Sequence, residues 1–346
     1  LAILFILAAH PSTSADTWQG PDSGNWSTSG NWGGGPLNSG DNVLFDENEH
    51  EGSVMDMASP FTVGSLTAEQ NGYTHTVDLN GNTLNVGARV EVGYLNEVTS
   101  RNAGLTFGNG TLNIGADGLP VSAYIGHKDS GSNRWVTGTL TQTSGDFAGY
   151  FDTLSVGYQK GDGTGTGSLD LSAIDGGTLS AQSLTVGWAN YQSDSNGTLT
   201  LGDEWSVTVG SEATPGTLRV ATRTSIYGST SGFFTAGPNG TFTVYATTFD
   251  VGSNGSMNNN GPSTGTLDLT GSTIAGEAGT LRVGYGRTST GTATLPAGTF
   301  DVTTVRIGDG DSGNFNGGTG TLNLLGTTLA VNPGGSVAID DSGDMN

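Results

Sequence analysis

The sequence is poor in the residues that carry most protein chemistry. Its 346 residues include no cysteine, four histidines, and only ten lysines and arginines against 32 aspartates and glutamates. Without cysteine the chain forms neither disulfide bonds nor thiolate zinc sites, and no paired histidines predict a catalytic zinc site. The net charge of −22 argues against nucleic acids and acidic membrane surfaces as partners, because both are bound through Lys and Arg.

Long hydrophobic runs are also missing, except for residues 1–9. This run is too short for a membrane-spanning helix, which needs about 20 residues. Small and polar residues follow it, and Thr13 and Ala15 fit the positions before a signal-peptidase cleavage site. We therefore predict that residues 1–15 are the end of a secretory signal peptide whose charged first part precedes Leu1. The alternative is a buried N-terminal strand.

Glycine, in contrast, is abundant, with 60 residues, and it recurs in two short motifs. In the first, an apolar residue, any residue, and Val or Ile precede a glycine, which is Gly64, Gly87, Gly93, Gly115, Gly126, Gly157, Gly187, Gly210, Gly252, Gly284 or Gly308. In the second, Gly-Thr-Leu or Gly-Ser-Leu begins at Gly110, Gly138, Gly167, Gly197, Gly265 or Gly320. Gly126, Gly157 and Gly187 lie 31 and 30 residues apart, so the repeat is about 30 residues long.

Both motifs alternate apolar and polar residues, a pattern that predicts short β-strands. We expect each strand to have about four or five residues and to stop at the glycine, which allows the positive φ of a sharp corner. Short strands, glycine corners and the 30-residue period predict an all-β solenoid over residues 61–340, in which Leu, Val and Ile stack from coil to coil. A β-sandwich or a propeller is the alternative, although propeller repeats are longer.

The segment from residue 16 to residue 60 differs from the repeats and is rich in tryptophan. Trp18, Trp26 and Trp32 lie close together in it. The first coil of a solenoid exposes unpaired strand edges and needs a cap, and we predict that these tryptophans provide it. A platform of aromatic rings that binds sugar is the alternative.

These motifs support a resemblance to a class of known proteins. The Trp- and Gly-rich stretch of residues 18–45 and the later repeats resemble autotransporter passenger-like and PEP-CTERM-type exported bacterial β-helix proteins. The resemblance implies secretion and a right-handed parallel β-helix, and it implies no catalytic residue. Residues 342–346 resemble the beginning of a dockerin-like calcium loop, and we expect residues 341–346 to start a further C-terminal segment.

Calcium is the cofactor that the loops favour. Asp309, Asp311 and Asn314 lie close together in one loop, and Asp162 lies in another. Carboxylate and amide oxygens are ligands for Ca²⁺, although neither loop matches a complete calcium-binding motif. Solvated turns are the alternative interpretation.

Two further patterns bear on function. His127, Lys128, Asp129 and Arg134 are the residues expected in a polysaccharide lyase, which needs a base and a charge partner, but they also suit a surface loop. Thr-x-Thr pairs at Thr139, Thr198 and Thr241 suggest the threonine ladders of ice-binding solenoids. Their irregular spacing and the preference of Thr for exposed strand faces argue against that interpretation.

We therefore predict a secreted or cell-surface structural and adhesive β-solenoid, without enzymatic activity, that acts as a stiff scaffold. Its expected partners are extracellular polysaccharide or neighbouring copies of itself. The alternative is a carbohydrate-active β-helix, either a polysaccharide lyase or a glycan-binding module.

Overall fold

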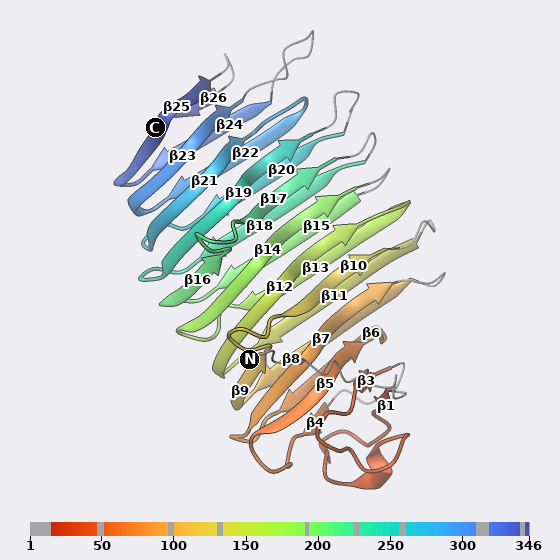
Figure 1. Cartoon of the computed structure of the whole chain (residues 1–346). Coiled ribbons are helices and arrows are strands. Elements are labelled where there is room, and N and C mark those ends of the chain that lie inside the picture. The colour runs from red at the N-terminus through yellow and green to blue at the C-terminus, as the bar shows by residue number, and fades with distance from the viewer. Residues whose placement is uncertain are drawn as a thin grey trace, which may run out of the picture.

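The protein is a β-solenoid built almost entirely from parallel strands (Figure 1). The computed structural model describes residues 15–46, 52–95, 100–129, 134–190, 194–224, 228–255, 261–308, 318–339 and 343–345. Within these residues the only helical element is the short 3₁₀ turn η1, Ser29–Asn31. No helix in this part of the chain has the length and hydropathy needed to cross a membrane. The predicted β-solenoid is thus confirmed.

Two sheets form the walls of the solenoid. Sheet 1 contains β1 (Asp16–Thr17), β3 (Val43–Phe45), β5 (Phe61–Ala68), β7 (Thr83–Leu95), β9 (Gly110–Ile114), β10 (Val121–Lys128), β12 (Gly145–Gln159), β14 (Gly177–Ala189), β16 (Trp205–Val209), β17 (Gly216–Arg223), β19 (Thr241–Asn254), β21 (Thr273–Val283), β23 (Ala297–Ile307) and β25 (Thr327–Ile339). Sheet 2 contains β2 (Gly24–Asn25), β4 (Gly52–Val54), β6 (Asn71–Asp78), β8 (Arg101–Gly108), β11 (Arg134–Gln142), β13 (Gly163–Leu171), β15 (Asp194–Leu201), β18 (Thr230–Ala236), β20 (Ser263–Asp268), β22 (Ser289–Leu295), β24 (Thr319–Leu324) and β26 (Gly343–Met345). The chain alternates between the two sheets, and each coil adds one level to both.

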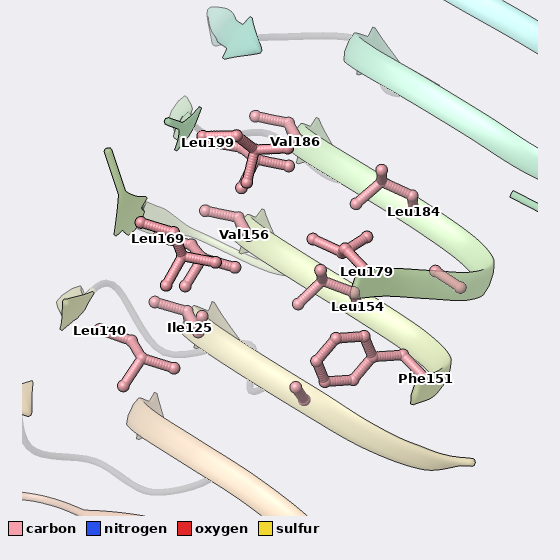
Figure 2. Close-up of a cluster of buried hydrophobic side chains, with 14 of the residues drawn as sticks. Ile125, Leu140, Phe151, Leu154, Val156, Leu169, Leu179, Leu184, Val186 and Leu199 are labelled. Atoms are coloured by element: carbon pink, nitrogen blue, oxygen red, sulfur yellow. The ribbon is translucent and has the colours of Figure 1, made fainter. Parts of the chain in front are cut away.

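The long strands of sheet 1 consist of two arms. In two levels the arms are separate strands, because β9 and β10 both pair with β7 and β12, while β16 and β17 both pair with β14 and β19. In β14 the ribbon turns between Leu179 and Leu184 (Figure 2). Each coil therefore has three sides, namely a first arm, a second arm and a strand of sheet 2.

The core is formed by columns of apolar side chains that repeat from level to level. Ile125, Val156 and Val186 are partners on adjacent second arms, and they face Leu140, Leu169 and Leu199 of sheet 2 across the interior (Figure 2). All six are buried. Sequence separations between stacked partners range from 23 residues (Phe61 to Leu84) to 35 residues (Leu112 to Phe147). The period of about 30 is thus an average, and the loops absorb the difference.

Glycine is required where the second arms meet sheet 2. Gly187 has a φ of 71°, and a Cβ atom there would lie 2.0 Å from the carbonyl oxygen of Ser231 in sheet 2. The expectation that strands end at these glycines is wrong, because β14 continues through Gly187 to Ala189. The glycine therefore allows a close approach of two backbones and a local change of direction, while the ladder of hydrogen bonds continues.

The tryptophan cluster closes the N-terminal end, as predicted. Trp18, Trp26 and Trp32 are 1%, 0% and 3% exposed, and their rings meet edge to face at 5.0 and 5.4 Å. Trp26 Nε1 donates to Ser53 Oγ at 2.9 Å, which is also 2.9 Å from His75 Nε2. Because the indoles are buried, they offer no platform on which a sugar could stack. The strands of this segment already pair with β5 and β6, so the sheets begin inside the cap.

Candidate functional site

A groove lined by aromatic side chains lies on the outer surface of sheet 1. It has a volume of about 280 Å³ and is formed by the second arms of β7, β10, β12 and β14. This volume is close to the lower end of the range for small-ligand pockets, roughly 300 to 1,000 Å³. The lining residues are Arg89, Tyr94, Tyr124, His127, Asp129, Thr153, Ser155, Tyr158, Ser183, Thr185 and Trp188. Aromatic rings, hydroxyl groups and opposite charges are thus combined in one concave surface.

The rings are brought together by strand register. Tyr94, His127, Tyr158 and Trp188 are successive partners on four adjacent strands. The His127 ring lies 5.3 Å from that of Tyr94 and 4.2 Å from that of Tyr158, and Tyr158 lies 4.9 Å from Trp188. We call these four residues the aromatic column. Each of the last three follows a glycine of the first motif with φ between 60° and 71°.

A cation is fixed against one end of the groove. The Arg89 guanidinium lies 5.0 Å from the Tyr94 ring and 4.8 Å from the Tyr124 ring, and it pairs with Glu91 at 2.5 Å. Cation–π contacts of this kind hold the guanidinium in place over the rings. At the rim, Lys160 Nζ lies 3.0 Å from Asp129 Oδ1. The groove therefore offers donors and acceptors beside its ring surfaces.

Burial keeps the titratable rings of the groove uncharged. The pKa of His127 falls to about 3, first because the ring is buried and then because Arg89 and Lys160 repel its charged form. Burial also raises the pKa values of Tyr94 and Tyr158. At neutral pH His127 is therefore a neutral imidazole, which has one donor and one acceptor nitrogen, and both tyrosines keep their hydroxyl protons.

One polar atom of the column points to a ligand. Trp188 Nε1 is buried and has no hydrogen-bond partner within the part of the chain that the structure describes. The next two positions of the same column, Thr222 and Ser253, also carry buried hydroxyl oxygens without a partner among these residues. Buried polar groups in proteins are nearly always hydrogen-bonded, so a ligand with hydroxyl groups suits this column.

The face around the groove is more basic than the rest of the protein. Arg89, Lys160, Arg219, Arg282 and Arg306 lie on it, which is half of the ten basic residues of the chain. Arg219 lies 5.3 Å from the Trp188 ring, and Arg282 pairs with the buried Asp250 through two 2.6 Å hydrogen bonds. An acidic protein thus presents one side on which neutral or acidic ligands meet little repulsion.

The four residues considered for a lyase are separated by the structure. His127 and Asp129 line the groove, whereas Lys128 points into the solenoid, is fully buried and donates to the Asp162 carbonyl oxygen. Neighbouring residues of a strand point to opposite faces, which separates Lys128 from His127. Arg134 begins β11 in sheet 2 and is exposed. Lys128 and His127 therefore do not lie together in one site, as the lyase hypothesis requires.

The calcium prediction falls mostly outside the described residues. Asp309, Asp311 and Asn314 lie in the segment 309–317, which is not described, and residues 1–14 of the predicted signal peptide are also outside. The described residues contain no group of three or more acidic or histidine side chains that could hold a metal ion. Asp162 is described, and its carbonyl oxygen accepts from Lys128 and Gln159. Calcium binding by the other three residues stays a prediction.

Comparison with known proteins provides no further assignment, since no family model, curated protein or solved structure matches the chain. The groove must therefore be judged on its own residues. Tyr94, Tyr124, Tyr158 and Trp188 were not singled out in the sequence. A signal was present, because an aromatic residue or histidine directly follows Gly93, Gly126, Gly157 and Gly187.

Proposed function

We propose that this protein is a secreted or cell-surface adhesive solenoid that binds saccharide chains in its aromatic groove. The observation that carries the proposal is the aromatic column, with hydroxyl groups and a fixed guanidinium beside it. Sugar rings have apolar faces that stack on aromatic side chains and hydroxyl groups that need hydrogen-bond partners. The groove provides both kinds of contact, and Trp188 Nε1 supplies a buried donor.

The scaffold explains why such a groove would be stiff. Its residues come from four adjacent strands whose backbones are joined by parallel ladders. Sites on strands hold their geometry better than sites on loops, so little ordering is needed on binding. Export to the cell surface is supported by the pattern of residues 1–15 and by the resemblance of the repeats to exported β-helix proteins.

The test measures retention of the purified chain on insoluble polysaccharides and its affinity for soluble neutral and acidic ones. Trp188→Ala should weaken binding at least about fivefold, since a stacked aromatic ring contributes roughly 1 kcal/mol beyond its buried area. Trp135→Ala is the matched control, because Trp135 is 49% exposed on sheet 2 and does not line the groove. Equal loss of binding in both variants, or no binding by the parent chain, would refute the proposal.

The same assay distinguishes the carbohydrate-active alternative. Release of reducing or unsaturated ends from any polysaccharide would show that the groove cleaves its ligand, and His127 would then be the residue to test first. Binding without release would support the adhesive function.

A further inference from the structure

The outer face of sheet 2 carries a second regular feature, made of threonine. On β11 the outward residues are Thr137, Thr139 and Thr141, and each begins a column that continues through β13, β15, β18, β20 and β22 to β24. No register shift interrupts these pairings, so the columns stay aligned over seven strands. The irregular spacing that argued against a threonine ladder lies in the loops and not in the sheet.

We call these 21 positions the hydroxyl array. The first column is Thr137, Thr166, Asn196, Ser231, Thr264, Thr290 and Thr319, with six hydroxyl residues; the second is Thr139, Ser168, Thr198, Phe233, Thr266, Thr292 and Thr321, also with six; the third is Thr141, Asp170, Thr200, Thr235, Asp268, Thr294 and Asn323, with four. Sixteen positions thus carry Thr or Ser. Phe233, 43% exposed, divides the array into two blocks of three strands.

The hydroxyl groups of the central column are available to a ligand. Thr139, Thr266 and Thr292 are partly exposed, and within the described part of the chain their side chains make no hydrogen bond. The two carboxylates of the array are in its third column and bind their own turns: Asp170 accepts from Ser172 N at 3.0 Å, and Asp268 accepts from Thr270 N at 3.0 Å. The first two columns therefore present uncharged hydroxyl and methyl groups only, apart from Asn196 and Phe233.

The array has the dimensions of a two-dimensional lattice. Adjacent strands are about 4.8 Å apart, and alternate residues of one strand are about 6.6 Å apart. Figure 1 shows the strands of sheet 2 stacked with little change of direction, so the columns run across them without a large turn. A ligand that fills such a surface must itself be periodic in two directions, and the oxygen atoms on faces of hexagonal ice have similar repeats.

We propose that the hydroxyl array binds ice. Threonine suits this ligand because its hydroxyl joins the lattice of water, while its β-branched methyl group restricts its own χ1 angle and orders the water around it. A crystalline polysaccharide is the rival periodic ligand. It is disfavoured because sugars stack on aromatic rings, and Phe233 is the one aromatic residue among the 21 positions. The proposal is independent of the saccharide groove, which lies on the other sheet.

The experiment measures thermal hysteresis and enrichment of the purified chain in slowly grown ice. Thr292→Lys places a charged chain in the middle of the second block and should remove most of both activities. Thr280→Lys is the matched control, since Thr280 is also half-buried in mid-strand but lies on sheet 1. Phe233→Thr completes the central column and should increase thermal hysteresis, a gain that misfolding cannot produce.

Three results would overturn the proposal: exclusion of the folded parent chain from ice, equal losses in Thr292→Lys and Thr280→Lys, or no gain in Phe233→Thr. Adsorption to crystalline cellulose or chitin that Thr292→Lys abolishes, without ice activity, would also overturn it and assign the array to a polysaccharide. Trp188→Ala should leave ice activity unchanged. Loss of saccharide binding by the groove and loss of ice binding by the array can therefore be observed separately.

Discussion

Gly187 provides a test of why glycine recurs where the second arms meet sheet 2. Gly187→Ala should lower the free energy of unfolding for two reasons, an unfavourable backbone conformation and a steric overlap. The left-handed φ of 71° is unfavourable for alanine by about 1–2 kcal/mol, while the loss of freedom in the unfolded chain returns about 0.4–1 kcal/mol. The added methyl must also displace the Ser231 carbonyl oxygen, which lies 2.0 Å from the Cβ position. Overpacking of this kind costs roughly 1–3 kcal/mol.

Substitution of Gly81 measures the cost of the backbone conformation without the steric overlap. It lies in the turn before β7 with a φ of 75°, and a Cβ atom there would meet nothing within 4 Å. We expect Gly81→Ala to lower the free energy of unfolding by about 1 kcal/mol and Gly187→Ala to lower it by about 2–4 kcal/mol. Guanidinium denaturation followed by circular dichroism measures both. Equal losses would show that backbone conformation alone, without close approach, selects glycine at the corner.

Three further predictions concern other parts of the molecule. Because burial holds the His127 pKa near 3 in place of 6.5, the free energy of unfolding should fall as pH decreases from about 6.5 towards 3, by on the order of 5 kcal/mol in total. Urea denaturation at a series of pH values measures this loss, and His127→Gln should remove it. Asp250→Ala leaves the Arg282 side chain without its carboxylate and should lower the free energy of unfolding by about 3 kcal/mol, measured in a thermal melt. An unchanged melt would mean that the ion pair contributes nothing to stability. Trp26→Ala should cost about 3–5 kcal/mol and loosen the cap, which proteolysis would detect as faster cleavage near the N-terminus.

The architecture could be predicted because local rules and the tertiary fold agree along most of the chain. Alternation with period two in the Gly-Thr-Leu motifs predicts strands with one apolar face, and stacking the coils of a short repeat buries such faces. Trp18, Trp26 and Trp32 could be assigned to a cap for a similar reason, since the first coil has no neighbour. Strand length was underestimated because a left-handed glycine usually ends a strand, whereas here the parallel ladder continues past Gly157 to Gln159.

The first glycine motif also turned out to occupy two places in the coil. Gly115 lies between the arms, after β9, while Gly126 lies in the second arm, within β10. The sequence does not distinguish them, because Val or Ile precedes a glycine in both places, and both of these glycines have a positive φ.

What the sequence determined by itself was therefore the β-solenoid, its average period, its apolar columns and its aromatic cap, because each follows from residue spacing within one coil. Only the tertiary structure decided which residues of different coils stand side by side. It separates Lys128 from His127, joins Tyr94 to Trp188 across four strands, and aligns Thr139 with Thr292 although loops of unequal length lie between them. Register between coils is set by backbone hydrogen bonds and core packing, and neither can be predicted from the residue spacing within a single repeat.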